Sequence, residues 1–255
     1  MAKPEGAFMD FSEFVRICSV LDDKSGRLEM ADILAEFLSK VPEENLPVVC
    51  YLIRGEVFPT WRGMELGVAG KLMVKSLAEV SGLKEDDIEK LIKEAGDTGL
   101  VAEQILVKKA QTTLFQEPLT VERVYDNLTK AAMLEGKGAQ DRKMGYIKEL
   151  LTNATPLDSR YLVKLILGEL RLGVGDGIIR DAIAKAFNVD AELVEQANNY
   201  TSDLGEAARI AKTGGNIALA KVNLTPMRPI KVMLAQKAEG IAEILGELGT
   251  AAFEL

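Results

Sequence analysis

Histidine is absent from this sequence of 255 residues. Its absence excludes the usual general base at neutral pH, the usual zinc ligand, and every catalytic pair in which histidine activates a serine or a cysteine. Any catalysis by this chain would have to use carboxylates or lysines, and we predict no bound metal ion.

Cysteines, aromatic residues and long apolar runs are also scarce. Cys18 and Cys50 are isolated, without the paired spacing of a metal or redox site. Aromatic residues make up 5% of the chain, whereas the helix-forming residues Leu, Ala, Glu and Lys are abundant. No apolar run approaches the roughly 20 residues of a membrane-spanning helix, and no secretory signal is visible. These features predict a helical, cytoplasmic protein without membrane contact.

The charge of the chain is negative overall but uneven. The formal net charge of −8 by itself argues against binding to nucleic acid. Residues 83–103 carry seven acidic residues against three lysines, whereas residues 136–148 carry four basic residues against Asp141 alone. Because phosphates respond to local charge, an acidic protein can still present a basic face to them.

A glycine-rich turn that leads into a helix occurs twice, at an offset of 106 residues. The helical pattern over 172–187 begins with Leu-Gly-Val, and the same triplet begins the stretch 66–80. We therefore predict a duplication, with repeat halves at about 50–110 and 160–221. The alternative is two unrelated helices with similar starts. The same offset pairs Ile88 with Val194, Glu89 with Glu195, Asp97 with Asp203, Gly99 with Gly205 and Ala102 with Ala208.

The glycine turns are candidate phosphate sites. Glycine exposes backbone N–H groups, and a helix start carries unpaired donors and partial positive charge. A third glycine turn, Gly136 to Lys143, also leads into a helix. The alternative interpretation is that the glycines only permit tight corners between helices, beside cations that face solvent.

Several other helix starts carry a capping residue. Thr120, Thr155 before Pro156, and Asp190 each precede a helical pattern. Asp97 and Asp203 each stand two residues before a glycine, and we interpret them as caps and not as a catalytic carboxylate pair.

The pattern changes after residue 221. Pro226 and Pro229 fall in an extended segment, a helix follows over 237–248, and residues 251–255 resemble the start of a strand. A strand needs a partner, so a larger domain is expected to begin at about 226 and to be cut short.

Four segments together resemble the N-terminal part of archaeal ATP-dependent DNA ligases: Tyr51 to Pro59, Gly136 to Lys143, Gly168 to Val174 and Pro229 to Gln236. Each is short, but their order and spacing are specific, and the likeness covers nearly the whole chain. The resemblance implies an all-α, many-helix DNA-binding domain over 1–225 with internal pseudo-two-fold duplication. It also implies that 226–255 are the truncated α/β start of a nucleotidyltransferase (adenylation) domain.

In that family the helical domain grips duplex DNA at a nick, in or beside the minor groove, for sealing in replication and repair. Phosphate contacts position such a domain without reading sequence. The implied partner is nicked double-stranded DNA, bound by a monomer in the cytoplasm at the nucleoid. We expect the three glycine turns to converge on one concave wall. The candidate DNA-binding residues are Gly67, Gly70, Lys71, Gly138, Ala139, Gln140, Arg142, Lys143, Arg171, Gly173, Gly175 and Gly177.

The resemblance also locates the nucleotide chemistry. In the family, a nucleophilic lysine follows, by two residues, a glutamate that meets the adenine. Glu254 matches that glutamate, and the lysine would be the residue after Leu255. The lysine attacks the α-phosphate of ATP. The complete enzyme is therefore expected to need ATP and Mg²⁺, whereas this chain is expected to bind neither and not to ligate alone.

The stretch Gln111 to Phe115 resembles the short motif by which archaeal ligases dock on a sliding clamp. Its candidate clamp-binding residues are Gln111, Leu114 and Phe115. The alternative is an ordinary loop whose Leu114 and Phe115 lie in the core. A helical interaction scaffold whose main task is clamp docking is the alternative function, and the acidic total charge favours it.

Overall fold

A computed structural model describes residues 9–107, 109, 118–231 and 240–250, and this part of the chain is all-α, as predicted. None of the described helices combines the length and apolarity that a membrane span requires. Two short 3₁₀ helices, η1 (Glu43–Asn45) and η2 (Thr60–Arg62), lie in loops. The α-helices are α1 (Phe11–Asp22), α2 (Arg27–Lys40), α3 (Leu46–Ile53), α4 (Gly70–Ser81), α5 (Glu85–Ala95), α6 (Thr98–Ile105), α7 (Val121–Ala132), α8 (Ala139–Asn153), α9 (Pro156–Leu167), α10 (Asp176–Phe187), α11 (Ala191–Thr201), α12 (Leu204–Leu219) and α13 (Ile241–Leu248).

The order of the helices repeats at the offset found in the sequence. Helices α4, α5 and α6 begin at Gly70, Glu85 and Thr98, and α10, α11 and α12 begin 106 residues later in each case. The correspondence also extends further toward the N-terminus than the predicted halves. Helices α2 and α3 contact α10 and α12 in the same way in which α8 and α9 contact α4 and α6.

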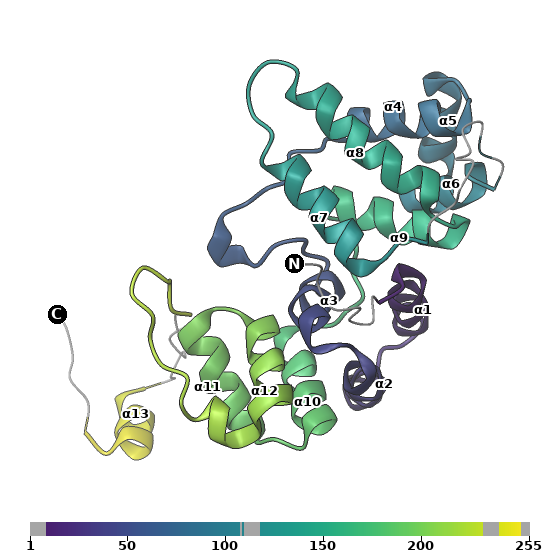
Figure 1. The fold of residues 1–255 in the computed structure, drawn as a ribbon. Helices are drawn as coiled ribbons and strands as arrows, with labels where there is room; N and C mark the ends of the chain where they lie inside the picture. The colour runs from purple at the N-terminus through teal and green to yellow at the C-terminus, as the bar shows by residue number, and fades with distance from the viewer. Residues whose placement is uncertain (1–8, 108, 110–117, 232–239, 251–255) are drawn as a thin grey trace, which may run out of the picture.

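The two halves exchange their last three helices. Helix α4 of the first half packs on α8, and α6 packs on α9, both of the second half. Reciprocally, α10 packs on α2, and α12 packs on α3. Figure 1 shows the result, with α4–α9 in an upper lobe and α10–α12 packed with α2 and α3 below. Each half therefore completes its core with helices of the other.

A reciprocal pair of backbone hydrogen bonds joins the starts of the two halves. The N–H of Phe11 donates to the carbonyl of Leu119 at 2.8 Å, and the N–H of Val121 donates to the carbonyl of Met9 at 2.9 Å. The residues between them form an isolated antiparallel bridge, in which the N-cap of α1 faces the N-cap of α7. The bridge therefore holds the starts of α1 and α7 side by side.

Two corresponding glycines allow the exchanged helices to pack closely. A Cβ on Gly99 in α6 would lie 2.6 Å from the carbonyl oxygen of Arg160 in α9. A Cβ on Gly205 in α12 would lie 2.6 Å from the Cα of Pro47 in α3. At Gly99 and at Gly205, a helix of one half therefore packs directly against the backbone of the other half.

Several predictions for the C-terminal part and the clamp motif fall outside the described residues. Helix α13 begins at Ile241 and overlaps the helix expected over 237–248. The expected strand over 251–255, with Glu254, and the clamp-binding candidates Gln111, Leu114 and Phe115 are not described. The domain boundary near 225, the nucleotidyltransferase start and the clamp motif therefore stay predictions.

The close contact at these glycines predicts opposite effects of alanine at different positions. Gly205→Ala and Gly99→Ala should each lower the free energy of unfolding by about 1–3 kcal/mol, because the added methyl overlaps a neighbouring backbone. Gly145→Ala, in the interior of α8 with open space around it, should raise it by about 0.5–1 kcal/mol. Urea denaturation measures all three. Equal effects at Gly205 and Gly145 would contradict the close packing of α12 on α3.

Candidate nucleic-acid interface

The starts of α4, α8 and α10 lack side-chain caps. Their N-cap residues are Ala69, Gly138 and Gly175, and none of these makes a side-chain hydrogen bond to the helix. Helices α2, α3, α5 and α13 are also uncapped, so a missing cap alone does not distinguish the glycine turns. Side-chain caps, which include all those predicted, are formed by Asp10, Asp97, Thr120, Thr155, Asp190 and Asp203.

The first and third glycine turns lie side by side. The Nζ of Lys143 in α8 donates a hydrogen bond of 2.8 Å to the carbonyl of Leu66. The same Nζ would lie 3.2 Å from a Cβ on Gly67, whose φ of +61° also favours glycine. A helix start and a partly exposed cation therefore lie side by side here. The exposed candidates around them are Gly67, Gly70, Lys71, Gly138, Gln140 and Arg142.

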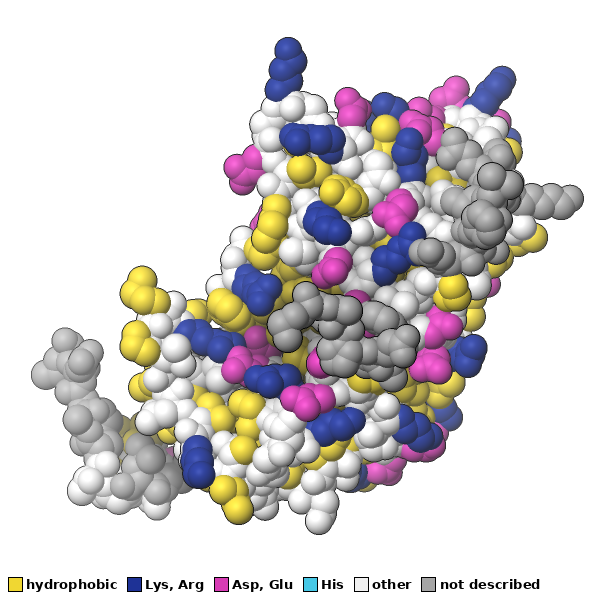
Figure 2. Space-filling model, in the orientation of Figure 1, with side chains coloured by type: hydrophobic (Ala, Val, Ile, Leu, Met, Phe, Trp, Pro, Cys, Tyr) yellow, Lys and Arg dark blue, Asp and Glu magenta, His cyan; other side chains and the backbone are white. Residues whose placement is uncertain are grey.

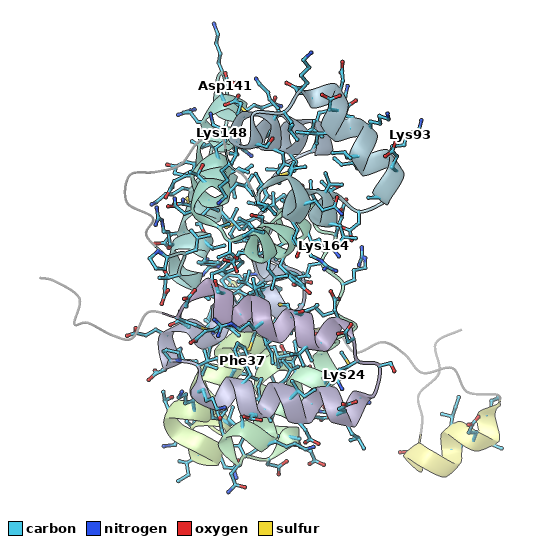
Figure 3. The ribbon with its side chains drawn as sticks, turned by 90° about the vertical axis from the view of Figure 1, so that its right-hand side faces the viewer. Lys24, Phe37, Lys93, Asp141, Lys148 and Lys164 are labelled. Atoms are coloured by element: carbon cyan, nitrogen blue, oxygen red, sulfur yellow. The ribbon has the colours of Figure 1, made fainter. Side chains whose placement is uncertain are left out.

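The local charge at α8 depends on which cations are already paired. Lys148 forms an ion pair with Glu79 of α4. Figure 3 shows α8 with Asp141 near its outer end and Lys148 further along. In the space-filling view, Lys and Arg side chains are spread over both lobes, with Asp and Glu between them (Figure 2). The other basic residues near the third turn are Lys137, Arg142 and Lys143.

The second glycine turn, before α10, has an exposed backbone. Arg171, Gly173 and Gly175 are exposed, and Gly173 has a φ of +70°. Gly177 is only partly exposed, because it lies beside Arg27 of α2. The turn therefore offers its first two glycines and Arg171 to a ligand more readily than its last glycine.

A carboxylate at the start of α10 distinguishes the second turn from the first. Asp176, the first residue of α10, forms ion pairs with Arg54 at 2.9 Å and with Lys231. The corresponding first residue of α4 is Gly70, which has no side chain. The two repeats therefore differ in charge at the helix start.

A groove of about 760 Å³ connects the first turn with the segment that leads to the second. One wall includes Leu66, Gly67 and Ala69, and the other includes the end of α9 from Leu165 to Gly168. Figure 1 also shows the α7–α8 turn, the loop before α4 and the segment after α12 on the left-hand side of the molecule. The structure therefore joins the first and third turns directly, whereas the lining of the groove on the α9 side ends at Gly168, before the second turn at 173–177.

One of the candidate residues is not accessible. Ala139 is 8% exposed, and its backbone N–H donates to the carbonyl of Gly136 at 3.2 Å. Ala139 therefore has little to offer a ligand directly. Its burial could have been predicted from the sequence, because Ala139 has the only apolar side chain between Lys137 and Lys143.

Asp203 has a larger role than the cap that the sequence predicts. It caps α12 through the N–H of Glu206 at 2.9 Å. Its carboxylate, in a residue 4% exposed, also accepts hydrogen bonds from the Tyr51 hydroxyl at 2.8 Å, the Trp61 Nε1 at 3.1 Å and the Arg228 Nη2 at 3.2 Å. Sequence reasoning missed these three partners. The only available signal was the single tryptophan, in a loop.

The Asp203 cluster changes the acidity of Tyr51. Burial, and then the negative charge of Asp203, raise the pKa of Tyr51 well above its ordinary value of 10.0. Tyr51 therefore keeps its proton, and its hydrogen bond to Asp203, throughout the physiological pH range. The cluster links α3, the loop that contains Trp61, the start of α12 and the segment after α12.

The fold and these helix starts define an all-helical, internally repeated module that presents backbone donors and cations from both halves. Residues 10–184 match the family described as DNA ligase N terminus, and the chain belongs to this family. The match covers α1 to α9 and most of α10.

Curated relatives are similar over nearly the whole chain. A DNA ligase of Methanothermobacter thermautotrophicus is 46% identical over 241 residues, which are 94% of this chain and 43% of the relative. A DNA ligase of Thermococcus fumicolans is 43% identical over 97% of this chain and 44% of its own length. That of Archaeoglobus fulgidus is 45% identical over 96% of this chain and 44% of its own length. The chain thus spans less than half the length of these relatives.

The Asp203 cluster predicts the effect of removing the Tyr51 hydroxyl. Tyr51→Phe should lower the free energy of unfolding at pH 7 by about 1–3 kcal/mol, because the buried carboxylate loses a hydrogen bond. The raised pKa means that the folded state keeps the Tyr51 proton above pH 10, where the unfolded state loses it. Stability should therefore fall as pH rises above about 10, and Tyr51→Phe should remove part of that decline.

Urea denaturation at about pH 7 and across about pH 9.5–11 measures both effects. Tyr146→Phe, at a partly exposed position of α8, is the matched control and should change stability by less than about 0.5 kcal/mol. If Tyr51→Phe and Tyr146→Phe change the free energy of unfolding equally at neutral and at high pH, the hydrogen bond from Tyr51 to Asp203 does not stabilise the fold as described.

Proposed function

We propose that this chain is the DNA-gripping module of an ATP-dependent DNA ligase and holds duplex DNA at a nick through phosphate contacts in or beside the minor groove. The family to which the chain belongs supports the assignment to a ligase. The main support for the proposed DNA contact is the junction of the first and third turns. There, Lys143 donates a hydrogen bond to the carbonyl of Leu66 beside two uncapped helix starts.

The glycines make close approach to a phosphate possible. A Cβ at Gly70, Gly138 or Gly175 would meet nothing within 4 Å, so there is open space at each of these starts. A phosphate oxygen can therefore reach the free N–H groups of the first helical turn, where the helix dipole also favours a negative charge. Contacts of this kind carry no sequence information, which suits the sealing of nicks at any sequence.

The cations add the larger part of the attraction. Lys71, Arg142 and Lys143 surround the joined first and third turns, and Arg171 stands before the second. Each lysine or arginine that neutralises a phosphate releases counterions from the duplex. Acidic residues are concentrated in the first turn of α5, away from these cations, although Asp141 and Asp176 lie in the first turns of α8 and α10.

The bond-forming step belongs, in this proposal, to the complete enzyme, where ATP and Mg²⁺ supply the sealing chemistry. This chain contributes by holding and orienting the duplex. Among the described residues there is no group of three or more Cys, Asp or Glu side chains that could hold a metal ion, and Glu254 lies outside them. The alternative of a clamp-docking scaffold has no support from the described residues, since Gln111, Leu114 and Phe115 also lie outside them.

The cations at the three glycine turns predict how duplex binding responds to substitution. The triple variant Lys71→Ala, Arg142→Ala, Arg171→Ala should bind a nicked duplex about 100-fold more weakly at about 0.1 M salt. The slope of log K against log salt should become shallower by roughly 3, because about three phosphate contacts are lost. Fluorescence anisotropy across a series of salt concentrations measures both quantities.

The matched control removes the same charge elsewhere. Lys40, Lys90 and Lys93 are exposed on α2 and α5, outside the glycine turns. Their triple alanine variant should keep most of the affinity and the slope. Equal losses in the two triple variants would show that only net charge matters, and no loss in either would overturn the proposed function.

A further inference from the structure

The segment that follows α12 is docked against the second glycine turn. We define residues 223–231 as the strap. The Ser202 hydroxyl donates to the carbonyl of Pro229 at 2.8 Å, and the N–H of Lys231 donates to the carbonyl of Asn199 at 3.0 Å. Both bonds join the strap to α11 and the residue after it. The strap therefore has a defined path, which brings Lys231 to the start of α10.

Arg228 holds the middle of the strap. Its Nη1 lies 2.7 Å from Glu206, and its Nη2 lies 3.2 Å from Asp203. The guanidinium also lies over the ring of Trp61, 4.6 Å from the centroid. Only 15% of the side chain is exposed. Planar pairing with carboxylates and stacking on an aromatic ring are contacts that arginine makes better than lysine.

A pocket of about 310 Å³ lies between the strap and the start of α10. Its lining includes Arg54, Trp61, Asp176 and Lys231, so two cations and one carboxylate face the same space. This pocket gives an anion room to enter beside Lys231. The strap therefore forms one wall of a cavity at the second turn as well as covering α11.

Lys231 neutralises the carboxylate of Asp176, which has no counterpart at the first turn. Asp176 places a carboxylate at the start of α10, where the first repeat has Gly70. Arg54 pairs with Asp176, but it also pairs with Glu56 at 3.2 Å. Without Lys231, two carboxylates would face a single cation at this start, and the cluster would repel a phosphate. With Lys231 the cluster is neutral, and the lysine side chain remains 45% exposed.

We propose that Lys231 is a phosphate-binding residue of the second turn and that Arg228 is the positioning residue that seats it there. This inference rests on the proposed function. Lys231 lies outside the repeated helices, so the strap gives the second turn the cation that the first turn obtains from Lys143 of α8. Asp203, which caps α12, also bonds to Trp61 and Arg228. Through Arg228 it helps to position Lys231 at the DNA.

A double-mutant cycle tests the positioning role. Lys231→Met should weaken binding of a nicked duplex by roughly 5- to 10-fold at about 0.1 M salt and make the salt slope shallower by about 1. Arg228→Met should cause a similar loss, because the strap no longer holds Lys231 at Asp176. The double variant should bind about as weakly as either single variant, because both remove one contact.

Two further variants separate positioning from a simple loss of charge or of folding. Lys40→Met, at the C-terminal end of α2, is the matched control and should bind as the unchanged protein does. Arg228→Lys keeps the charge beside Asp203 and should recover part of the salt slope. Trp61 fluorescence should shift in Arg228→Met, which loses the stacked guanidinium, and should stay unchanged in Lys231→Met. Circular dichroism should show that both variants remain helical.

The outcomes distinguish this inference from the proposed function. If the losses of Arg228→Met and Lys231→Met add in the double variant, Arg228 does not act through Lys231 and the positioning role is overturned. If Lys231→Met binds normally while the Lys71, Arg142 and Arg171 triple variant is weak, Lys231 is not a contact but the module still binds DNA. If that triple variant also binds normally, the proposed function itself fails.

Discussion

The close packing of α6 on α9 and of α12 on α3 is the constraint on which the rest of the structure depends. At Gly99 and Gly205 there is no room for a Cβ, so each exchanged helix must lie directly on the backbone of the other half. Helices α4 and α10 belong to the same exchanged units and pack on α8 and α2. Their starts are therefore fixed by the packed core and not only by the loops that precede them. A binding surface on such rigid elements is held in a defined geometry.

Charge around the turns is arranged largely in short-range ion pairs. Glu79 pairs with Lys148, so the basic character of α8 is concentrated at its start. Lys143 donates to a neutral carbonyl beside the first turn, and no carboxylate of the described residues forms an ion pair with it. At the second turn a carboxylate is matched by cations from two segments distant in sequence. A net charge of −8 is thus compatible with local surfaces that attract phosphate.

The features that could be predicted from the sequence depend on local chemistry. The predicted caps form as expected, because a cap bonds to a residue only two or three positions away. The repeat was visible in α4–α6 and α10–α12, where the offset is constant, but not in α1–α3 and α7–α9, where the spacing changes. Contacts between distant segments could not be predicted. Tyr51, Trp61 and Arg228 reach Asp203 from three separate segments, and no local spacing indicates that they meet. The junction of the first and third turns likewise follows only from the packing of α4 on α8.

The central claim is that helix starts from both halves contact the same duplex. Backbone amide NMR during titration with a nicked duplex tests it most directly. Amide signals at 67–72, 138–143 and 173–178 are expected to shift together with one dissociation constant, while those of the acidic helix α5 stay in place. Shifts confined to one half, or centred on residues outside these three starts, would contradict it.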